Sequence, residues 1–236
     1  MTEAETWLTA FPLQPATEAV EALYDAWTQL AAEPRPDFNE KTWEDKLTKR
    51  LKIYVENVTA RERGLLGMWA AEDVFGEIDP ISKVLVEERR TDIVYGWNND
   101  DTSTSMKLVF EFKRLGRTKR HRDHYLGDDG LQRFVTGIYS RQQAVAAMVG
   151  VLLDPEGEIV PPIQKMLEDE DLCQKLRLLQ SASGTSITRP SELFTRAEFD
   201  TEHERHPSLA ASHGTIRVSH MFFRFGYPTT THRPKK

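Results

Sequence analysis

Two runs of strand-forming residues flank a polar turn in residues 90–113, which read RTDIVYGWNNDDTSTSMKLVFEFK. Apolar, aromatic and β-branched residues dominate 90–95 and 106–112, and this pattern predicts a β-hairpin closed by the polar segment 98–105. If the turn is symmetric about the bond between Asp101 and Thr102, Asp92 lies opposite Glu111, because both are equally far from that point. Cross-strand neighbours are about 4.5–5.5 Å apart at Cβ. The sequence therefore predicts two adjacent carboxylates.

The second strand of this hairpin carries the triplet Glu111-Phe112-Lys113. Side chains two residues apart on a strand share a face, so Glu111 and Lys113 are predicted to point together toward solvent. The alternate residues Leu108, Phe110 and Phe112 are then predicted to pack inward. Two facing carboxylates at such a position are either a cation site or simply a charged sheet face in contact with water.

A divalent cation would relieve the repulsion between Asp92 and Glu111, because carboxylates this close disfavour each other's ionised form. Hard ions such as Mg²⁺ or Mn²⁺ take oxygen ligands, typically one or two carboxylates together with substrate phosphate oxygens and water. A lysine two residues further along the strand could orient and help deprotonate an attacking water, or stabilise charge that develops on a phosphate. Asp92 and Glu111 are therefore the predicted metal ligands, with Mg²⁺ or Mn²⁺ as the cofactor.

Apolar residues recur at helical or strand spacing along most of the chain around this hairpin. Helices are predicted, in chain order, at 17–33, 39–58, 65–74, 130–148 and 162–180, and further strands at 83–86, 149–153, 193–204 and 215–227. This order indicates an α/β (α+β) fold with a central mixed β-sheet flanked by helices, N-terminal helices and a C-terminal β-hairpin. We expect an acidic N-terminal helical arm at 1–36 and a single domain at 37–236. In that domain we expect a core at about 39–154, a C-terminal helix and hairpin extension at 155–228 and a basic tail at 229–236.

The composition excludes several classes of protein. The 236 residues carry 37 acidic and 31 basic side chains and are 39% apolar, as is typical of a soluble globular protein. The single cysteine, Cys173, excludes an internal disulfide and a thiolate zinc site. The chain has no run of eighteen apolar residues and no basic N-terminus, so we expect neither a membrane span nor a secretory signal. We expect a cytoplasmic protein. Motifs for phosphate-binding loops and nucleophilic serines are absent as well.

Charge is unevenly distributed along the chain. Residues 1–34 contain six acidic and no basic residues, whereas residues 113–122 contain six basic residues in ten positions. The helix predicted in the acidic arm also has an apolar stripe, which either packs on the core or docks a protein partner or a second copy of the chain. Basic side chains directly after a metal-binding strand would surround a phosphodiester and supply salt-sensitive affinity for nucleic acid. The predicted nucleic-acid-binding residues are Arg114, Arg117, Lys119, Arg120, Arg122, Arg133 and Arg141.

In this combination of motif and element order the chain resembles the PD-(D/E)xK superfamily, the restriction-endonuclease-like nucleases. Their core is a helix, a three-strand meander, a helix and a fourth strand, and the elements predicted from residue 39 to residue 154 follow that order. The resemblance implies that Asp92 and Glu111 bind the metal and that Lys113 is the catalytic lysine. Thr91 stands where the superfamily name has proline.

The resemblance also implies a carboxylate from the first core helix and an activity. Glu44 is the candidate, because it lies at the edge of the predicted buried face, and Glu40 is the weaker choice. The implied activity is that of a Mg²⁺-dependent nuclease, a hydrolase cutting phosphodiester bonds in DNA in preference to RNA. The alternative is a non-catalytic nucleic-acid-binding or scaffold subunit of a larger DNA-processing or defence complex.

Histidines and tryptophans give weaker signals. Four histidines near the C-terminus could form a zinc site. No cysteine is nearby and no predicted helix carries two of them at a spacing of four residues, so surface or strand-packing roles are favoured. These residues are His203, His206, His213 and His220. The tryptophans are mostly predicted in the core, and Trp97, at the turn beside Asp92, is the candidate for base stacking.

Overall fold

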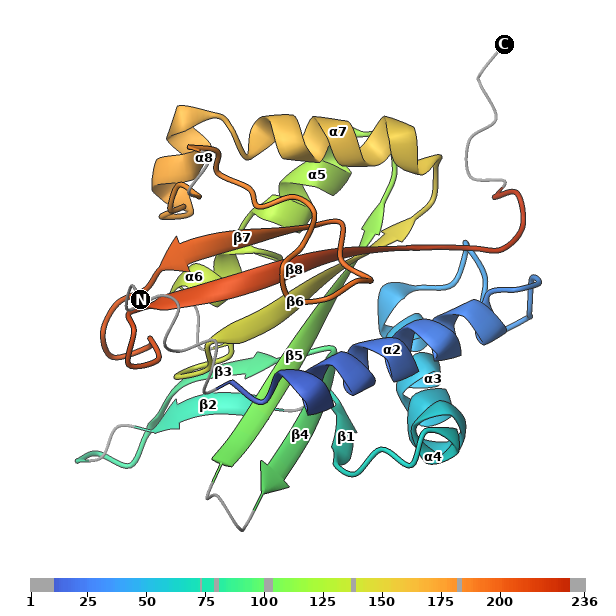
Figure 1. Cartoon of the computed structure of the whole chain (residues 1–236), viewed down its shortest axis with the longest axis horizontal. Helices are drawn as coiled ribbons and strands as arrows, with labels where there is room; N and C mark the ends of the chain where they lie inside the picture. The colour runs from blue at the N-terminus through green and yellow to red at the C-terminus, as the bar shows by residue number, and fades with distance from the viewer. Residues whose placement is uncertain are drawn as a thin grey trace.

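The two central strands of the molecule lie side by side and run parallel. The computed structural model describes residues 11–72, 74–78, 81–99, 104–136, 139–181 and 184–229. Within them, β5 (Thr104–Leu115) and β6 (Val145–Leu152) lie in the middle of a six-stranded mixed sheet (Figure 1). The sheet order is β1-β4-β5-β6-β8-β7, in which the other strands are β1 (Met68–Ala71), β4 (Ile93–Asn99), β7 (Phe199–Glu204) and β8 (Thr215–Arg224). The predicted mixed sheet is confirmed, and its C-terminal hairpin is the antiparallel pair β7–β8.

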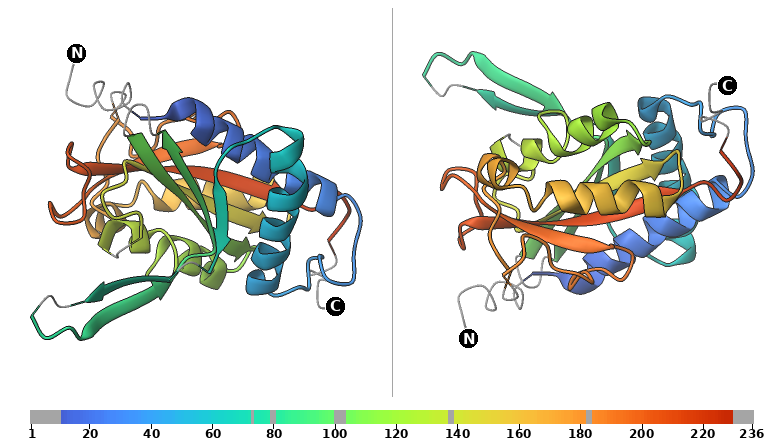
Figure 2. Two further views of the ribbon diagram at one scale, coloured as in Figure 1. Left: turned by 90° about the horizontal axis from the view of Figure 1, so that it is seen from below. Right: turned by 90° about the horizontal axis from the view of Figure 1, so that it is seen from above.

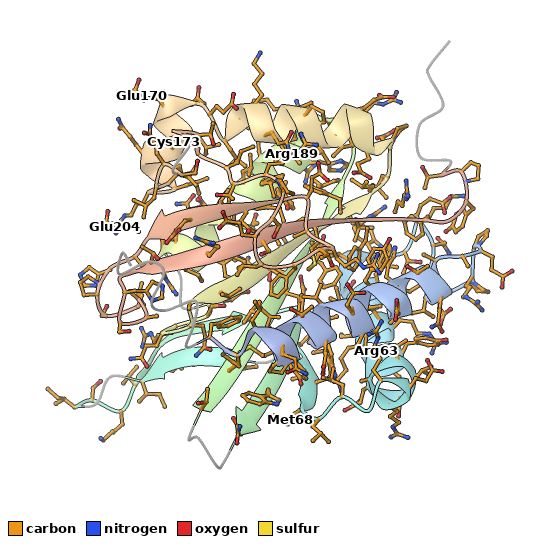
Figure 3. All side chains as sticks on the ribbon, in the orientation of Figure 1. Arg63, Met68, Glu170, Cys173, Arg189 and Glu204 are labelled. Atoms are coloured by element: carbon orange, nitrogen blue, oxygen red, sulfur yellow. The ribbon has the colours of Figure 1, made fainter. Side chains whose placement is uncertain are left out.

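Helices flank this sheet, as predicted, and they cover both of its faces (Figures 1 and 2). One face is covered by α2 (Leu13–Leu30) and α3 (Glu44–Tyr54), which continues through a π-helical turn (Val55–Thr59) into α4 (Ala60–Glu62). The other face is covered by α5 (Lys119–Leu126), α6 (Gln132–Thr136), α7 (Glu156–Met166) and α8 (Glu170–Lys175), which carries Cys173 (Figure 3). No helix among the described residues is long and apolar enough to cross a bilayer.

Each face of the sheet has its own hydrophobic cluster, and β5 contributes to both. Leu108, Phe110 and Phe112 belong to the cluster under α2 and α3, and Val109 belongs to the cluster under α5–α8. The predicted alternation is therefore confirmed. The prediction that the other face points to solvent is wrong, because helices cover this face too, and Glu111 is only 1% exposed.

The acidic N-terminal segment contributes α2 to the first of these clusters. Val20, Leu23 and Trp27 are buried, and the Trp27 indole N–H donates to the carbonyl of Arg224 at 2.8 Å. The apolar stripe of this helix thus packs on the chain's own core, which is one of the two expectations for it. Residues 1–10 lie outside the described residues.

Two predicted elements before the hairpin differ in the structure. The helix predicted at 65–74 is wrong, because this segment holds the edge strand β1. Gly64 and Gly67 have φ values of 63° and 144°, and a Cβ at Gly67 would collide with the ring of Tyr95, so the chain turns here and does not wind into a helix. The strand predicted at 83–86 falls partly in β3 (Leu85–Arg90), which pairs with β2 (Val74–Ile78) in a separate hairpin projecting from the body (Figure 2).

The helix predicted at 130–148 is wrong in its second half. The short helix α6 ends at Thr136, and β6 begins at Val145. The strand predicted at 149–153 is confirmed in part, because residues 149–152 belong to β6. All eight residues of β6 are buried, because helices cover both faces, and no alternation marks where such a strand begins. The helix predicted at 162–180 is two helices, α7 and α8, and the strand predicted at 193–204 begins only at Phe199.

A chain of polar groups crosses the cluster under α5–α8. His203 Nδ1 lies 2.8 Å from the carbonyl oxygen of Leu176 and donates to it, so its Nε2 accepts from the Thr201 hydroxyl at 2.8 Å. Thr201 in turn accepts from His220 Nε2 at 2.9 Å, and His220 Nδ1 accepts from the hydroxyl of Tyr125 at 2.9 Å. Burial lowers the pKa of His203 to about 4 and the pKa of His220 well below its ordinary value. Both rings are neutral, and the strand-packing role predicted for them is confirmed.

Candidate functional site

The register of the β4–β5 hairpin is the predicted one and brings Asp92 and Glu111 together. Ile93 pairs with Phe110, which places the centre of the hairpin between residues 101 and 102. The turn at 100–103 itself lies outside the described residues. Asp92 directly precedes β4, and its Oδ2 accepts a hydrogen bond from the backbone N–H of Phe112 at 2.7 Å. This bond holds the Asp92 carboxylate against β5, next to Glu111.

Glu111 is a buried carboxyl group with one unsatisfied oxygen. Its Oε1 lies 3.1 Å from Lys113 Nζ and 3.3 Å from a guanidinium nitrogen of Arg133, whereas its buried Oε2 has no hydrogen-bond partner among the residues that the structure describes. Burial, and then the neighbouring carboxylate of Asp92, raises the pKa of Glu111 to about 8. Burial also raises the pKa of Asp92 to about 6, although the Lys113 ammonium group acts to lower it. The pair therefore favours a cation that replaces these protons.

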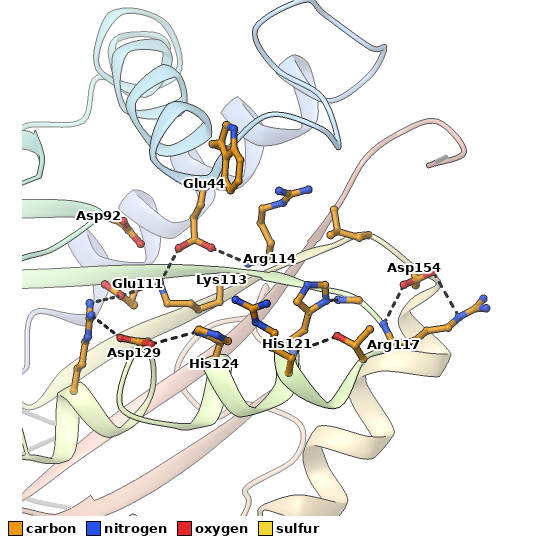
Figure 4. Close-up of a pocket in the computed structure, with 16 residues that line it drawn as sticks. Glu44, Asp92, Glu111, Lys113, Arg114, Arg117, His121, His124, Asp129 and Asp154 are labelled. Carbon is orange, nitrogen blue, oxygen red and sulfur yellow. Dashed lines mark hydrogen bonds and ion pairs between the residues drawn. The ribbon is translucent and has the colours of Figure 1, made fainter. Parts of the chain in front are cut away.

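Lys113 is held in place by Glu44, the first residue of α3 (Figure 4). Lys113 Nζ donates to Glu44 Oε1 at 2.8 Å and to the carbonyl of Phe112 at 2.6 Å. The second carboxylate oxygen of Glu44 accepts the backbone N–H of Arg114 at 2.9 Å. Burial acts to lower the pKa of Lys113, but the carboxylates of Glu111, Glu44 and Asp92 outweigh it and raise this pKa above its ordinary value. Lys113 is consequently a fixed cation at neutral pH.

One cavity of about 760 Å³ joins these groups to a basic wall (Figure 4). All four residues predicted as catalytic line it, namely Glu44, Asp92, Glu111 and Lys113. Four of the seven predicted nucleic-acid-binding residues line it as well, namely Arg114, Arg117, Arg120 and Arg133. Three of these four arginines come from the end of β5, the connection that follows it and the first turn of α5, namely Arg114, Arg117 and Arg120.

Some predicted residues lie elsewhere. Lys119 pairs with Asp123 at 2.9 Å on α5, and neither it nor Arg122 nor Arg141 lines the cavity. Glu40, the weaker candidate for the helix carboxylate, is buried and accepts a hydrogen bond from the Tyr227 hydroxyl at 3.2 Å. Of the two glutamates considered, Glu44 is the one at the site.

Arg133 is part of a side-chain network that the sequence pattern did not indicate. Its guanidinium group donates to Glu111 at 3.3 Å, to the Tyr139 hydroxyl at 3.0 Å and to Asp129 at 3.2 Å. The other oxygen of Asp129 lies 3.3 Å from His124 Nδ1, so a continuous chain runs from Glu111 to α5 (Figure 4). Arg133 therefore orients a candidate metal ligand. The only sequence signal for this network is the Asp128-Asp129 pair before Gly130, which reads as a turn.

The tryptophan next to the cavity is not the expected one. Trp97 is partly buried against the first hydrophobic cluster and lines a separate small cavity together with Gln14 and Leu66. Trp43, one of the tryptophans predicted in the core, instead lines the main cavity and is 70% exposed. It sits at the N-cap position of α3, before the first helical turn, where the stripe of buried positions has not yet begun.

The residues at the base of the cavity fit an oxygen-binding cation with two protein ligands. Among the described residues, no group of three or more His, Cys, Asp and Glu side chains is arranged to hold a metal ion. Of the three carboxylates around Lys113, Glu44 has both oxygens bound by Lys113 and by the backbone of Arg114, which leaves Asp92 and Glu111 as the candidate ligands. Mg²⁺ commonly takes one or two protein carboxylates and completes its shell with water and phosphate oxygens. The unpartnered Oε2 of Glu111 is an oxygen suited to such an ion.

No protein-family model, no curated protein and no solved structure matches the chain. The described residues define a mixed α/β protein with a six-stranded sheet between two layers of helices. They also define a polar cavity in which carboxylates from α3, the start of β4 and β5 surround one lysine. An inference about function therefore depends on the chemistry of this cavity.

Replacing Asp92 with Asn should raise the melting temperature measured in a chelator at pH 8. The variant keeps an acceptor for the Phe112 N–H and removes the charge that the folded site disfavours. The folded pKa of Asp92 is about 6 against an ordinary 3.8, so its ionisation costs stability as pH rises through this interval, by about 1.4 kcal/mol per pKa unit. The difference between variant and wild type should vanish near pH 3. A melting temperature at pH 8 below that of wild type would instead show that Asp92 acts mainly as a structural acceptor.

Proposed function

We propose that the chain is a Mg²⁺-dependent nuclease that hydrolyses phosphodiester bonds in DNA. The observation that carries this proposal is the pair of buried carboxyl groups with raised pKa values, Asp92 and Glu111, beside the fixed ammonium group of Lys113. The pair lies in a cavity with an arginine-rich wall, a combination suited to a metal ion and an anionic substrate.

Each side chain has a role in this proposal. Asp92 and Glu111 would hold Mg²⁺, which when bound polarises a phosphate oxygen and makes a bound water more acidic. Lys113 is protonated, so it stabilises negative charge on the phosphate in the transition state and is not itself the general base. Glu44 fixes the position of the lysine, and Arg133 fixes the position of Glu111. Arg114, Arg117 and Arg120 line the cavity and would contact phosphates of the substrate strand.

The order of elements supports the same proposal. The elements follow one another in the order expected for a PD-(D/E)xK core, namely α3, the strands β1, β4 and β5, the helices α5 and α6, and the strand β6. The β2–β3 hairpin is inserted after the first strand. Asp92 stands at the start of the second of these strands, and Glu111 and Lys113 stand on the third. We therefore propose membership of that superfamily together with the activity.

The experiment that tests the proposed activity uses supercoiled plasmid and linear single-stranded DNA, each incubated with the full chain in Mg²⁺, in Mn²⁺ and in EDTA. We expect nicked, linear or shortened products with either metal and none in EDTA. DNA binding without cleavage under every condition would contradict the proposed activity and favour the non-catalytic scaffold function. A parallel reaction with RNA of the same sequence measures the preference between the two nucleic acids.

A further inference from the structure

A second cavity adjoins the proposed catalytic cavity, and Trp43 forms the boundary between them. This second cavity measures about 650 Å³ and is lined by the loop before α3 and by the outer face of that helix. Trp43 lines both cavities and directly precedes Glu44. Its side chain is 70% exposed. An exposed indole ring at the edge of a polar cavity is a surface on which a nucleic-acid base can stack.

The outer face of α3, which lines the second cavity, is basic. Trp43, Lys46, Arg50 and Ile53 follow one another at spacings of three and four, so they share this face of the helix. The buried Leu47 and Leu51 lie on a different side of the helix. The cavity lining also includes Lys41 and Lys49, and among the described residues that line it Asp37 is the single acidic one.

Two of these cations are available for a ligand. Lys49 is paired with Glu72 at 3.0 Å and Arg50 with Asp37 at 3.3 Å. Within the part of the chain that the structure describes, neither Lys41 nor Lys46 has a carboxylate within ion-pair distance, and both are exposed. The cavity therefore has an excess of positive charge, which suits a phosphate backbone.

We propose that this second cavity, the α3 groove, holds a single-stranded segment of the DNA substrate, with one base stacked on Trp43. The inference rests on the proposed nuclease function, because a strand bound at Asp92 and Glu111 would leave the catalytic cavity past Trp43. Base pairs in a duplex stack on one another, so only an unpaired base presents a free face to the indole ring. The face from residue 43 to residue 53 is about 15 Å long, the length of about four stacked nucleotides.

Fluorescence anisotropy of labelled oligo(dT) with the full chain in EDTA tests the stacking contact without cleavage. Trp43→Ala should weaken binding about tenfold, a loss within the range measured for base–aromatic stacking. Trp43→Phe keeps an aromatic face and should restore most of the affinity. The exposure of Trp43 means that neither variant disturbs the core. Affinity for a duplex oligonucleotide should change little in either variant.

The salt dependence of binding tests the two lysines. The double variant Lys41→Gln/Lys46→Gln should reduce the slope of log K against log salt by about 1.4, since each phosphate contact with a single strand contributes about 0.7. The matched control is Lys165→Gln/Lys175→Gln, which removes two exposed lysines from α7 and α8, on the other face of the sheet. This control should leave the slope unchanged.

The outcomes separate this inference from the proposed nuclease activity. If Trp43→Ala binds oligo(dT) as tightly as the wild type does, the proposed role of the α3 groove is wrong, even if the wild type cuts DNA. Equal losses of affinity for single-stranded and duplex DNA also overturn it, because they indicate contacts with the phosphates alone. A selective loss for single strands, in a chain that cuts no DNA with any metal, supports the groove and contradicts only the nuclease activity.

Discussion

Replacing Lys113 with Met should reduce DNA cleavage by about 10²–10³-fold, the loss typical of removing one preorganised electrostatic stabiliser. Lys113 Nζ lies between Glu44 and Glu111, so methionine removes the cation that pairs with both carboxylates and that we propose faces the substrate phosphate. The variant should fold, because the side chain of methionine fills a similar volume and Glu111, with a pKa of about 8, remains largely protonated at neutral pH. Initial rates on plasmid DNA under saturating Mg²⁺ measure the effect.

The matched control for this variant is Lys175→Met, on α8 at the far side of the sheet. This control also replaces a lysine with methionine, but at an exposed position, and it should cut DNA at the wild-type rate. Cleavage by Lys113→Met at a rate similar to that of the control would contradict the role given to this lysine. Circular dichroism spectra of both variants establish that the comparison is between folded proteins.

Replacing Glu111 with Gln should weaken Mn²⁺ binding by more than about 100-fold and abolish cleavage. Even the mutation of a residue that only supports a metal ligand typically lowers metal affinity or activity by about 10–100-fold. Glutamine can still accept the hydrogen bonds from Lys113 and Arg133, so the change removes a charge and leaves the packing in place. In a chelator, the variant should also lose the part of the decrease in stability that ionisation of Glu111 causes in wild type as pH rises from 4.5 toward 8. Glu170→Gln, at an exposed position of α8, is the control.

Wild-type activity in Glu111→Gln would show that the buried carboxyl group has a structural role only. A variant that binds Mn²⁺ normally but does not cut would indicate that Glu111 acts on the substrate and not on the metal. Either result would require a different pair of ligands, and the described part of the cavity offers Asp92, Asp129 and Asp154 as the remaining acidic groups apart from Glu44.

The hairpin that positions the site could be predicted because the residues that determine its register are close together in the sequence. A polar turn between two strand-like runs sets one register, and the observed pairing of Ile93 with Phe110 is the pairing that a symmetric turn gives. Glu44 could be predicted as well, because it stands one turn before the buried residues of its helix and thus at the edge of the core.

The rest of the site depends on contacts between distant segments. Asp129 and Tyr139 lie outside helices and strands, and only the packing of α6 against β5 brings Arg133 between them and Glu111. Only the C-terminal part of β6 could be predicted, as the strand at 149–153, because burial on both faces removes the alternation that would have marked its first residues. The edge strand β1 was hidden because it spans only four residues, too short for a periodic pattern.

The proposed metal site is tested most directly by calorimetric titration of the full chain with Mn²⁺ at pH 7, repeated in buffers of different ionisation enthalpy. We predict saturable binding that releases close to one proton, since the metal displaces the proton that a pKa of about 8 keeps on Glu111. Proton release should fall at pH 9, and Glu111→Gln and Asp92→Asn should show little or no saturable binding. Absence of saturable binding by the wild type, or binding of equal strength in both variants, would contradict a metal site formed by Asp92 and Glu111.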